Sequence, residues 1–186
     1  MAEEAFIITQ MLEWGVDLVH LRKPGAGYDA CAKLLTAIPQ PLRYKIVTHE
    51  HFALADEFQL HGIHLNRRNP MAPEHFMGSQ SCSCHSLQEV ECAKKKYDYV
   101  FLSPIFDSIS KKGYKTTFND DLLYAASRNG TIDDKVIALG GVSAAKIPLL
   151  QHYGFGGAAL LGDVWNRVGD KDFEQYIRNL KTFKKI

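Results

Sequence analysis

The sequence predicts an α/β protein with a parallel sheet, arranged as a TIM-type (β/α)₈ barrel that lacks its first strand. Short apolar, β-branched runs alternate along the chain with stretches of helical periodicity. Polar or glycine residues stand at the C-terminal end of nearly every apolar run. Glycines also follow each of the last two runs, which is where barrels of this type commonly hold phosphate.

Each element follows from a local pattern. Strands are expected where β-branched apolar residues end in a polar or glycine residue, at 17–22, 44–49, 62–66, 81–85, 99–104, 135–141 and 156–162. Helices are expected where apolar residues recur every three or four positions, at 6–14, 28–38, 52–58, 86–96, 119–129, 144–154 and 172–183. Strands separated by helices cannot form hairpins, so they must run parallel and have both faces covered.

The polar strand ends favour a barrel over an open sheet. They are His20 and Arg22, Thr48 and His49, His64 and Asn66, Ser83 and His85, Ser103, Gly140 and Gly141, and Gly162. An open sheet concentrates its site at one switch point, whereas a barrel gathers all strand ends in one ring. Seven strands would leave two sheet edges unpaired, so we expect either that the start of the sequence is truncated or misassigned or that a partner chain closes the sheet.

Composition limits the classes of function. The 186 residues are 46% apolar and 23% charged, which predicts one globular domain over residues 1–186. With 22 basic and 21 acidic residues and no long basic block, a nucleic-acid partner is not expected. The start of the sequence lacks the layout of a signal peptide and no apolar run is long enough to span a membrane, which predicts a cytoplasmic protein without a membrane partner.

The strand-end residues indicate an anion site more than a metal site. Backbone N–H groups at Gly140, Gly141 and Gly162 are predicted to form a phosphate cradle. A lone histidine in a half-buried strand is more often hydrogen-bonded than a ligand or base, which predicts a structural role for His64. The histidines at the strand ends match no local zinc motif and would be neighbours only in a barrel, so a zinc site is not expected. A charged residue at a strand end, such as Arg22, forms a surface ion pair about as often as it binds a ligand. Ligand binding is favoured here only because several such residues are expected on the same rim of the barrel.

Several segments together resemble one family. They are HLRKP, IVTHEHFALADEFQLHGIHLN, SCSCHSLQE, DYVFLSPIFDSISKKGY, VIALGGV and GFGGAALLGD. Over residues 14 to 165 the chain is similar to the thiamine phosphate synthase and thiazole tautomerase family. The resemblance implies a TIM barrel that joins hydroxymethylpyrimidine diphosphate to thiazole phosphate, releasing pyrophosphate with the help of Mg²⁺. Both substrates would be small phosphorylated heterocycles.

The resemblance also implies roles for particular residues. Arg22 matches an arginine that binds pyrophosphate, and Ser83 matches a serine beside the pyrimidine and diphosphate. A hydroxyl-x-hydroxyl-Lys loop corresponds to Ser108, Ser110 and Lys111, and the amides that hold the thiazole phosphate correspond to Gly141 and Gly162. Strand-end neighbours of these residues, His20 and Gly140, are expected to contact substrate or phosphate.

Two departures from the family pattern concern the metal. The Asn-Asp pair whose Asp binds magnesium is Thr48-His49 here, and a second magnesium-binding Asp is Asn69. Because Mg²⁺ prefers oxygen ligands, above all carboxylates and phosphates, we expect weak binding that depends on the diphosphate of the substrate.

Two other functions fit the same residues. In a tautomerase the thiazole carboxylate phosphate would be aromatised by proton transfer, with His85 as the acid–base group. Loss of the magnesium carboxylates favours this function, whereas Arg22 and the Ser-x-Ser-Lys loop favour the synthase. A barrel without activity that binds a phosphorylated thiamine precursor is the third possibility.

Overall fold

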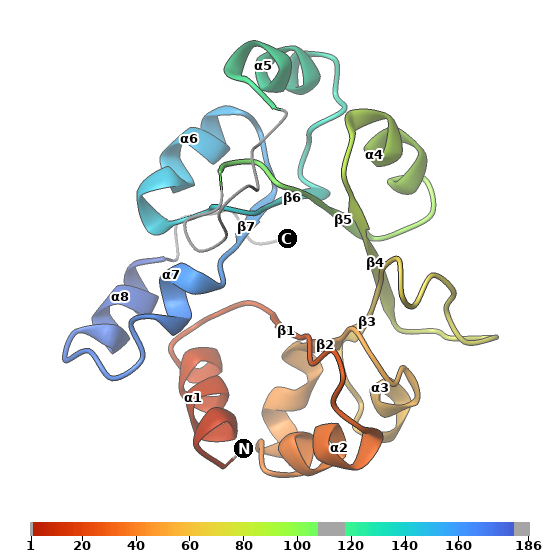
Figure 1. The fold of residues 1–186 in the computed structure, drawn as a ribbon, viewed down its shortest axis with the longest axis vertical. Coiled ribbons are helices and arrows are strands. Elements are labelled where there is room, and N and C mark those ends of the chain that lie inside the picture. The colour runs from red at the N-terminus through yellow and green to blue at the C-terminus, as the bar shows by residue number, and fades with distance from the viewer. Residues whose placement is uncertain (1, 108–117, 181–186) are drawn as a thin grey trace. The chain divides into compact units, whose positions relative to one another are not determined.

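The computed structural model describes residues 2–107 and 118–180 of the chain (Figure 1). These residues form two compact units, which are taken one at a time. Among the described residues, the first unit consists of 2–81 with 174–180, and the second of 82–107 with 118–173. Hydrogen bonds order the strands β1 to β7 in the sheet as they follow in the sequence. Among the described residues no helix is long and apolar enough to cross a membrane.

The first unit contains the first three strands and the start of the fourth. In chain order its elements are α1 (Ala2–Glu13), β1 (Val19–Leu21), α2 (Tyr28–Thr36), the 3₁₀ helix η1 (Gln40–Lys45), β2 (Ile46–Thr48), α3 (Ala53–Glu57), β3 (Gly62–Leu65) and, near the other end of the chain, most of α8 (Phe173–Asn179). Strands β1, β2 and β3 pair in parallel. Ile46, Ile63 and Leu65 are buried on one face of this part of the sheet.

The second unit contains the end of the fourth strand and the last three. Its elements are β4 (Ser79–Cys84), α4 (Leu87–Ala93), β5 (Tyr99–Leu102), α5 (Asp120–Arg128), β6 (Val136–Leu139), the 3₁₀ helix η2 (Ala144–Lys146), α6 (Ile147–His152), β7 (Gly157–Ala159) and α7 (Gly162–Trp165). Strands β5, β6 and β7 pair in parallel.

Helices of the second unit begin where the sequence provides a capping side chain. Ser86 accepts a hydrogen bond from the Glu89 N–H at the start of α4, and Asn119 accepts one from the Leu122 N–H at the start of α5. Such caps satisfy backbone donors that the first helical turn leaves unpaired. The helices then pack on buried strand residues, among them Val100 and Val136, to form one hydrophobic core.

The structure confirms the predicted α/β fold of TIM-barrel type and the seven strands, each within a few residues of its expected position. The predicted helices are also present, and two short elements were not expected. The helix α7 has only four residues, and η1 buries none of its residues. Neither segment therefore has the repeated apolar positions by which a helix is recognised in a sequence. The single domain over residues 1–186 stays a prediction.

Candidate active site

The pairing register places three histidines on one face of the first unit. His20 of β1 pairs with Val47 of β2, which in turn pairs with Gly62 of β3. Side chains alternate between the two faces of a strand, so residues two positions further along return to the same face. His49 and His64 therefore project on the same side as His20, opposite to the apolar face.

The three imidazoles contact one another. The Nδ1 atom of His20 lies 2.9 Å from Nε2 of His49. The rings of His49 and His64 are stacked with centroids 4.2 Å apart, and the ring of His20 meets both of them edge-on. His64 is fully buried, and its Nδ1 lies 2.8 Å from the Ser81 hydroxyl oxygen. His64 is therefore hydrogen-bonded, as expected from the sequence.

Burial keeps these imidazoles neutral at ordinary pH. Desolvation, the nearby His64 and the positive charges of Arg22 and Arg68 lower the pKa of His49 to about 2. Desolvation alone lowers the pKa of His64 to about 3. The pKa of His20 is well below its usual value, chiefly through burial and then through His64 and His49. None of the three is therefore suited to act as a proton donor near pH 7.

The loops after β2 and β3 hold the backbone around His49. The side-chain amide of Asn69 donates a hydrogen bond to the His49 carbonyl at 2.9 Å, and that of Asn66 reaches the same oxygen at 3.4 Å. Glu50 accepts hydrogen bonds from the Lys23 N–H at 2.9 Å and from Arg68 Nη2 at 3.1 Å. Glu50 was not among the sequence-predicted site residues, although it directly follows a strand-end histidine.

Arg22 lies at the end of β1 with its side chain exposed. It is close enough to His49 for its positive charge to act on that imidazole. The next residue, Lys23, forms an ion pair with Glu4 of α1 at 2.5 Å. Arg22 and Arg68 therefore provide the positive charge next to the histidine cluster, while Lys23 ties the first helix to the strand end.

In the second unit, His85 and Ser103 are brought together at the ends of β4 and β5. Nδ1 of the exposed His85 lies 3.0 Å from the carbonyl oxygen of Ser103 and 3.3 Å from its hydroxyl oxygen. The His85 N–H donates to the Glu89 carboxylate at 2.6 Å. Ser83 is half-buried on β4, one position before buried Cys84. The predicted Ser108, Ser110 and Lys111 lie outside the described residues.

The glycine pair after β6 has a packing role of its own. Gly140 and Gly141 adopt φ values of +91° and +64°, which side-chain-bearing residues rarely do. A Cβ atom on Gly141 would lie 2.4 Å from the Asp107 carbonyl oxygen. A backbone hydrogen bond joins the segment after β5 to the glycine pair, because the Phe106 N–H donates to the Gly140 carbonyl at 3.0 Å. The glycines are thus required by close backbone packing, whether or not phosphate binds.

Gly162 differs, because a Cβ atom there would enter open space, with its nearest neighbour 3.8 Å away. Its neighbour Asp163 accepts a hydrogen bond from the Ala144 N–H at 2.8 Å, which joins the loops that follow β6 and β7. The two loops predicted to form the phosphate cradle are therefore adjacent. The Asp163 carboxylate already occupies one of their backbone donors.

We expect Gly141→Ala to lower the free energy of unfolding by about 2 kcal/mol, because it adds a steric clash to an unfavourable φ. Gly162→Ala should change it by less than about 0.5 kcal/mol, as is usual at an unobstructed surface position. Urea unfolding of both variants measures the two values. Equal losses would show that the backbone near Gly141 is not packed as described.

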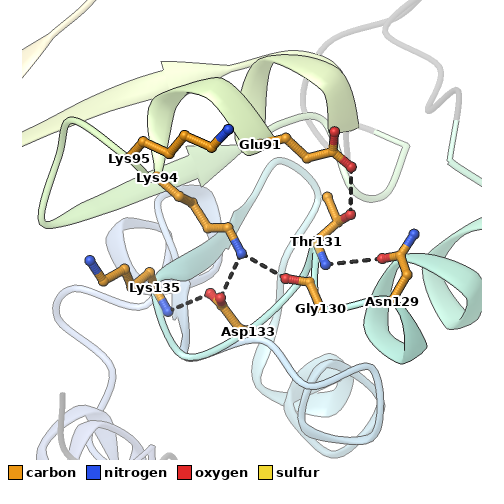
Figure 2. A pocket seen from close by; sticks show the side chains of 8 residues that line it. All are labelled: Glu91, Lys94, Lys95, Asn129, Gly130, Thr131, Asp133 and Lys135. Carbon is orange, nitrogen blue, oxygen red and sulfur yellow. Dashed lines mark hydrogen bonds and ion pairs between the residues drawn. The ribbon is translucent and has the colours of Figure 1, made fainter.

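A surface pocket in the second unit lies away from these strand ends (Figure 2). It is lined by residues that surround Lys94, including Glu91, Thr131 and Lys135. Lys94 Nζ donates to the Asp133 carboxylate at 2.5 Å and to the Gly130 carbonyl at 2.8 Å. Because Lys135 directly precedes β6, this pocket lies at the N-terminal end of that strand, where barrels do not place their active sites. We interpret it as a structural link between α4 and the loop before β6.

Comparison with known proteins gives consistent results. A family model described as thiamine monophosphate synthase matches residues 2–164. The crystal structure of a thiamine phosphate pyrophosphorylase from Bacteroides thetaiotaomicron is 43% identical, with a TM-score of 0.87 over 97% of this chain and 90% of that one. The thiamine-phosphate synthase of Latilactobacillus sakei is 25% identical over 172 residues, covering 85% of this chain and 76% of that protein. A thiamine phosphate pyrophosphorylase from Pyrococcus furiosus, 18% identical with a TM-score of 0.75 over 96% of this chain and 87% of that one, shares the fold.

Proposed function

The chain belongs to the thiamine monophosphate synthase family and is therefore a transferase of thiamine biosynthesis; we propose that it joins hydroxymethylpyrimidine diphosphate to thiazole phosphate. The observation that carries this proposal is the family match, which spans nearly the whole chain. Polar residues at the strand ends of each unit are the groups that would contact the two substrates.

The proposed reaction needs stabilisation of a leaving group. The bond between the pyrimidine methylene carbon and the diphosphate oxygen breaks, and its electron pair leaves with pyrophosphate. The thiazole phosphate then bonds to that carbon. Arg22 would bind the departing diphosphate through its planar guanidinium, and Ser83 would donate a hydrogen bond beside the pyrimidine. Donors held in place before reaction stabilise the charge that develops on the oxygens.

The remaining proposed contacts follow from the resemblance. Ser108, Ser110 and Lys111 would complete the diphosphate site, and backbone amides at Gly141 and Gly162 would hold the thiazole phosphate. Proximity of the loops after β6 and β7 supports the second assignment. Phosphate would have to compete with Asp163 for the Ala144 N–H there.

The residues at the family's magnesium positions do not fit magnesium. His49 offers a nitrogen, and the Asn69 side chain uses its amide to hold the His49 carbonyl. The nearby carboxylate, Glu50, is engaged by Arg68 and by the Lys23 N–H. Any Mg²⁺ would have to arrive with the diphosphate, whose oxygens it prefers. No step of the proposed reaction at this chain's residues depends on it.

The synthase is preferred over the tautomerase because the relatives described above are thiamine-phosphate synthases or pyrophosphorylases. His85 remains the residue to test for proton transfer, since it is exposed and contacts Ser103. The cytoplasmic location, the homo-oligomer and the lack of a nucleic-acid partner stay predictions.

A direct assay separates the three functions. The full chain is incubated with both phosphorylated precursors, with and without Mg²⁺, and thiamine phosphate and pyrophosphate are measured. We expect both products in equal amounts, with His85→Ala retaining most of the rate. Aromatisation of a thiazole carboxylate phosphate, abolished in His85→Ala, would instead establish the tautomerase. Binding of a precursor without turnover would establish the binding protein.

A further inference from the structure

We propose that His20, His49 and His64 form a binding site for a zinc-type divalent cation. Each of the three offers one ring nitrogen, and the three nitrogens all lie within 4.8 Å of one another. The residues come from the ends of β1, β2 and β3, and all belong to the first unit. This inference goes beyond the proposed function, because it concerns a cation that the transfer reaction described above does not use.

The spacing of the ring nitrogens is close to that of a tetrahedral site. Two ligands about 2.05 Å from zinc at the tetrahedral angle are separated by about 3.3 Å. Nδ1 of His20 and Nε2 of His49 are already 2.9 Å apart, and the largest separation within the cluster is below 4.8 Å. The rings of His49 and His64 are stacked, so they must turn for both nitrogens to face one cation, and the cation then replaces the hydrogen bond between His20 and His49.

The electronic character of the donors selects the kind of cation. Metals bind neutral imidazole, and the burial of His49 and His64 and the partial burial of His20 disfavour the charged form of each ring. Imidazole suits Zn²⁺, Co²⁺ and Ni²⁺, whereas Mg²⁺ requires oxygen ligands. In the part of the chain that the structure describes, the group that could hold a metal ion contains three histidines and no carboxylate. The site is therefore expected to discriminate strongly in favour of Zn²⁺ and against Mg²⁺.

A neighbouring hydroxyl orients one of the rings. Ser81 Oγ lies 3.4 Å from the Ile63 carbonyl, to which it donates, and 2.8 Å from Nδ1 of His64. We assign the proton of His64 to Nδ1, so that Ser81 accepts it and Nε2 acts as the ligand. Metal-binding histidines usually donate their other N–H in this way, and removal of the acceptor typically weakens binding 10- to 100-fold.

The surrounding charges indicate what would complete the coordination. Three protein ligands leave a fourth position, as in catalytic zinc sites. Arg22 and Arg68 act on His49 with positive charge, and Arg68 is partly neutralised by Glu50. A bound cation would add to this positive charge, so the fourth ligand is expected to be an anionic oxygen such as hydroxide or a phosphate oxygen.

The test uses the full chain after treatment with a chelator, with Zn²⁺ or Co²⁺ as the probe. Calorimetry is expected to give one tightly bound Zn²⁺, and Co²⁺ should give the intense visible absorption of a tetrahedral site. His20→Gln and His49→Gln should each weaken Zn²⁺ binding at least 100-fold, and Ser81→Ala should weaken it 10- to 100-fold. His75→Asn is the matched control, because His75 is exposed and Asn tolerates its φ of +61°.

Circular dichroism checks that each variant is folded, and half-buried His20 provides a second variant should the His49 change prevent folding. Unchanged Zn²⁺ affinity in folded His20→Gln would overturn the proposal. Loss of affinity in His75→Asn, or an octahedral Co²⁺ spectrum, would also overturn it by placing the ion elsewhere. A chain that binds Zn²⁺ but makes no thiamine phosphate would contradict the proposed function and leave the metal site standing.

Discussion

Arg22→Ala is expected to lower kcat/KM for thiamine phosphate formation by about 100-fold or more, which is the usual effect of removing one prearranged donor to a developing charge. Arg22 lies at the end of β1, exposed and close to His49. In the proposed reaction its guanidinium binds the pyrophosphate as negative charge grows on the leaving oxygen. The family resemblance predicts the same decrease in kcat/KM for Lys111→Ala. Steady-state kinetics with both precursors measures the change.

Two further variants make this test specific. Arg22→Lys retains the charge but loses the planar fork that matches phosphate geometry, so its activity should fall between those of wild type and Arg22→Ala. Lys135→Ala removes an exposed charge at the other end of a strand and should retain full activity. If folded Arg22→Ala works at nearly the wild-type rate, the diphosphate is bound elsewhere.

In the metal-free protein, lowering the pH from 7 to 5 is expected to reduce the free energy of unfolding by about 4 kcal/mol through His49 and His64. Their pKa values are about 2 and about 3 in the folded chain, against the ordinary value of 6.5. The unfolded chain therefore binds protons in this range that the folded chain does not, and stability falls as pH falls. Each histidine contributes about 1.4 kcal/mol per pH unit below 6.5.

The direction follows from the groups that face the cluster. Arg22, Arg68 and the neighbouring imidazoles disfavour added positive charge, and burial removes the water that would stabilise it. The stabilisation is present above pH 6.5 and is lost progressively below it. Urea unfolding in a chelator at several pH values measures the loss. His49→Gln should reduce it by about 2 kcal/mol, and an unchanged pH dependence in that variant would contradict the prediction.

The order of strands and helices could be read from the sequence because it depends on local patterns. A helix such as α5 repeats its apolar residues with helical spacing and begins at a capping Asn119. Strands such as β5 are short runs of consecutive buried residues. Parallel pairing follows because helices separate the strands. The barrel arrangement is favoured because polar residues stand at the strand ends. Each of these inferences needs only neighbours in the chain.

The register in which the strands pair cannot be predicted from local sequence patterns. This register determines which residues surround those at the strand ends. His20, His49 and His64 are far apart in sequence, and they meet because Val47 pairs with both His20 and Gly62. The positive φ of Gly141 likewise reflects its approach to Asp107, and Asp163 reaches Ala144 only because two loops are adjacent. The sequence by itself determined which residues stand at the strand ends; the tertiary structure decided which of them touch, because contacts between strands depend on how the strands are aligned.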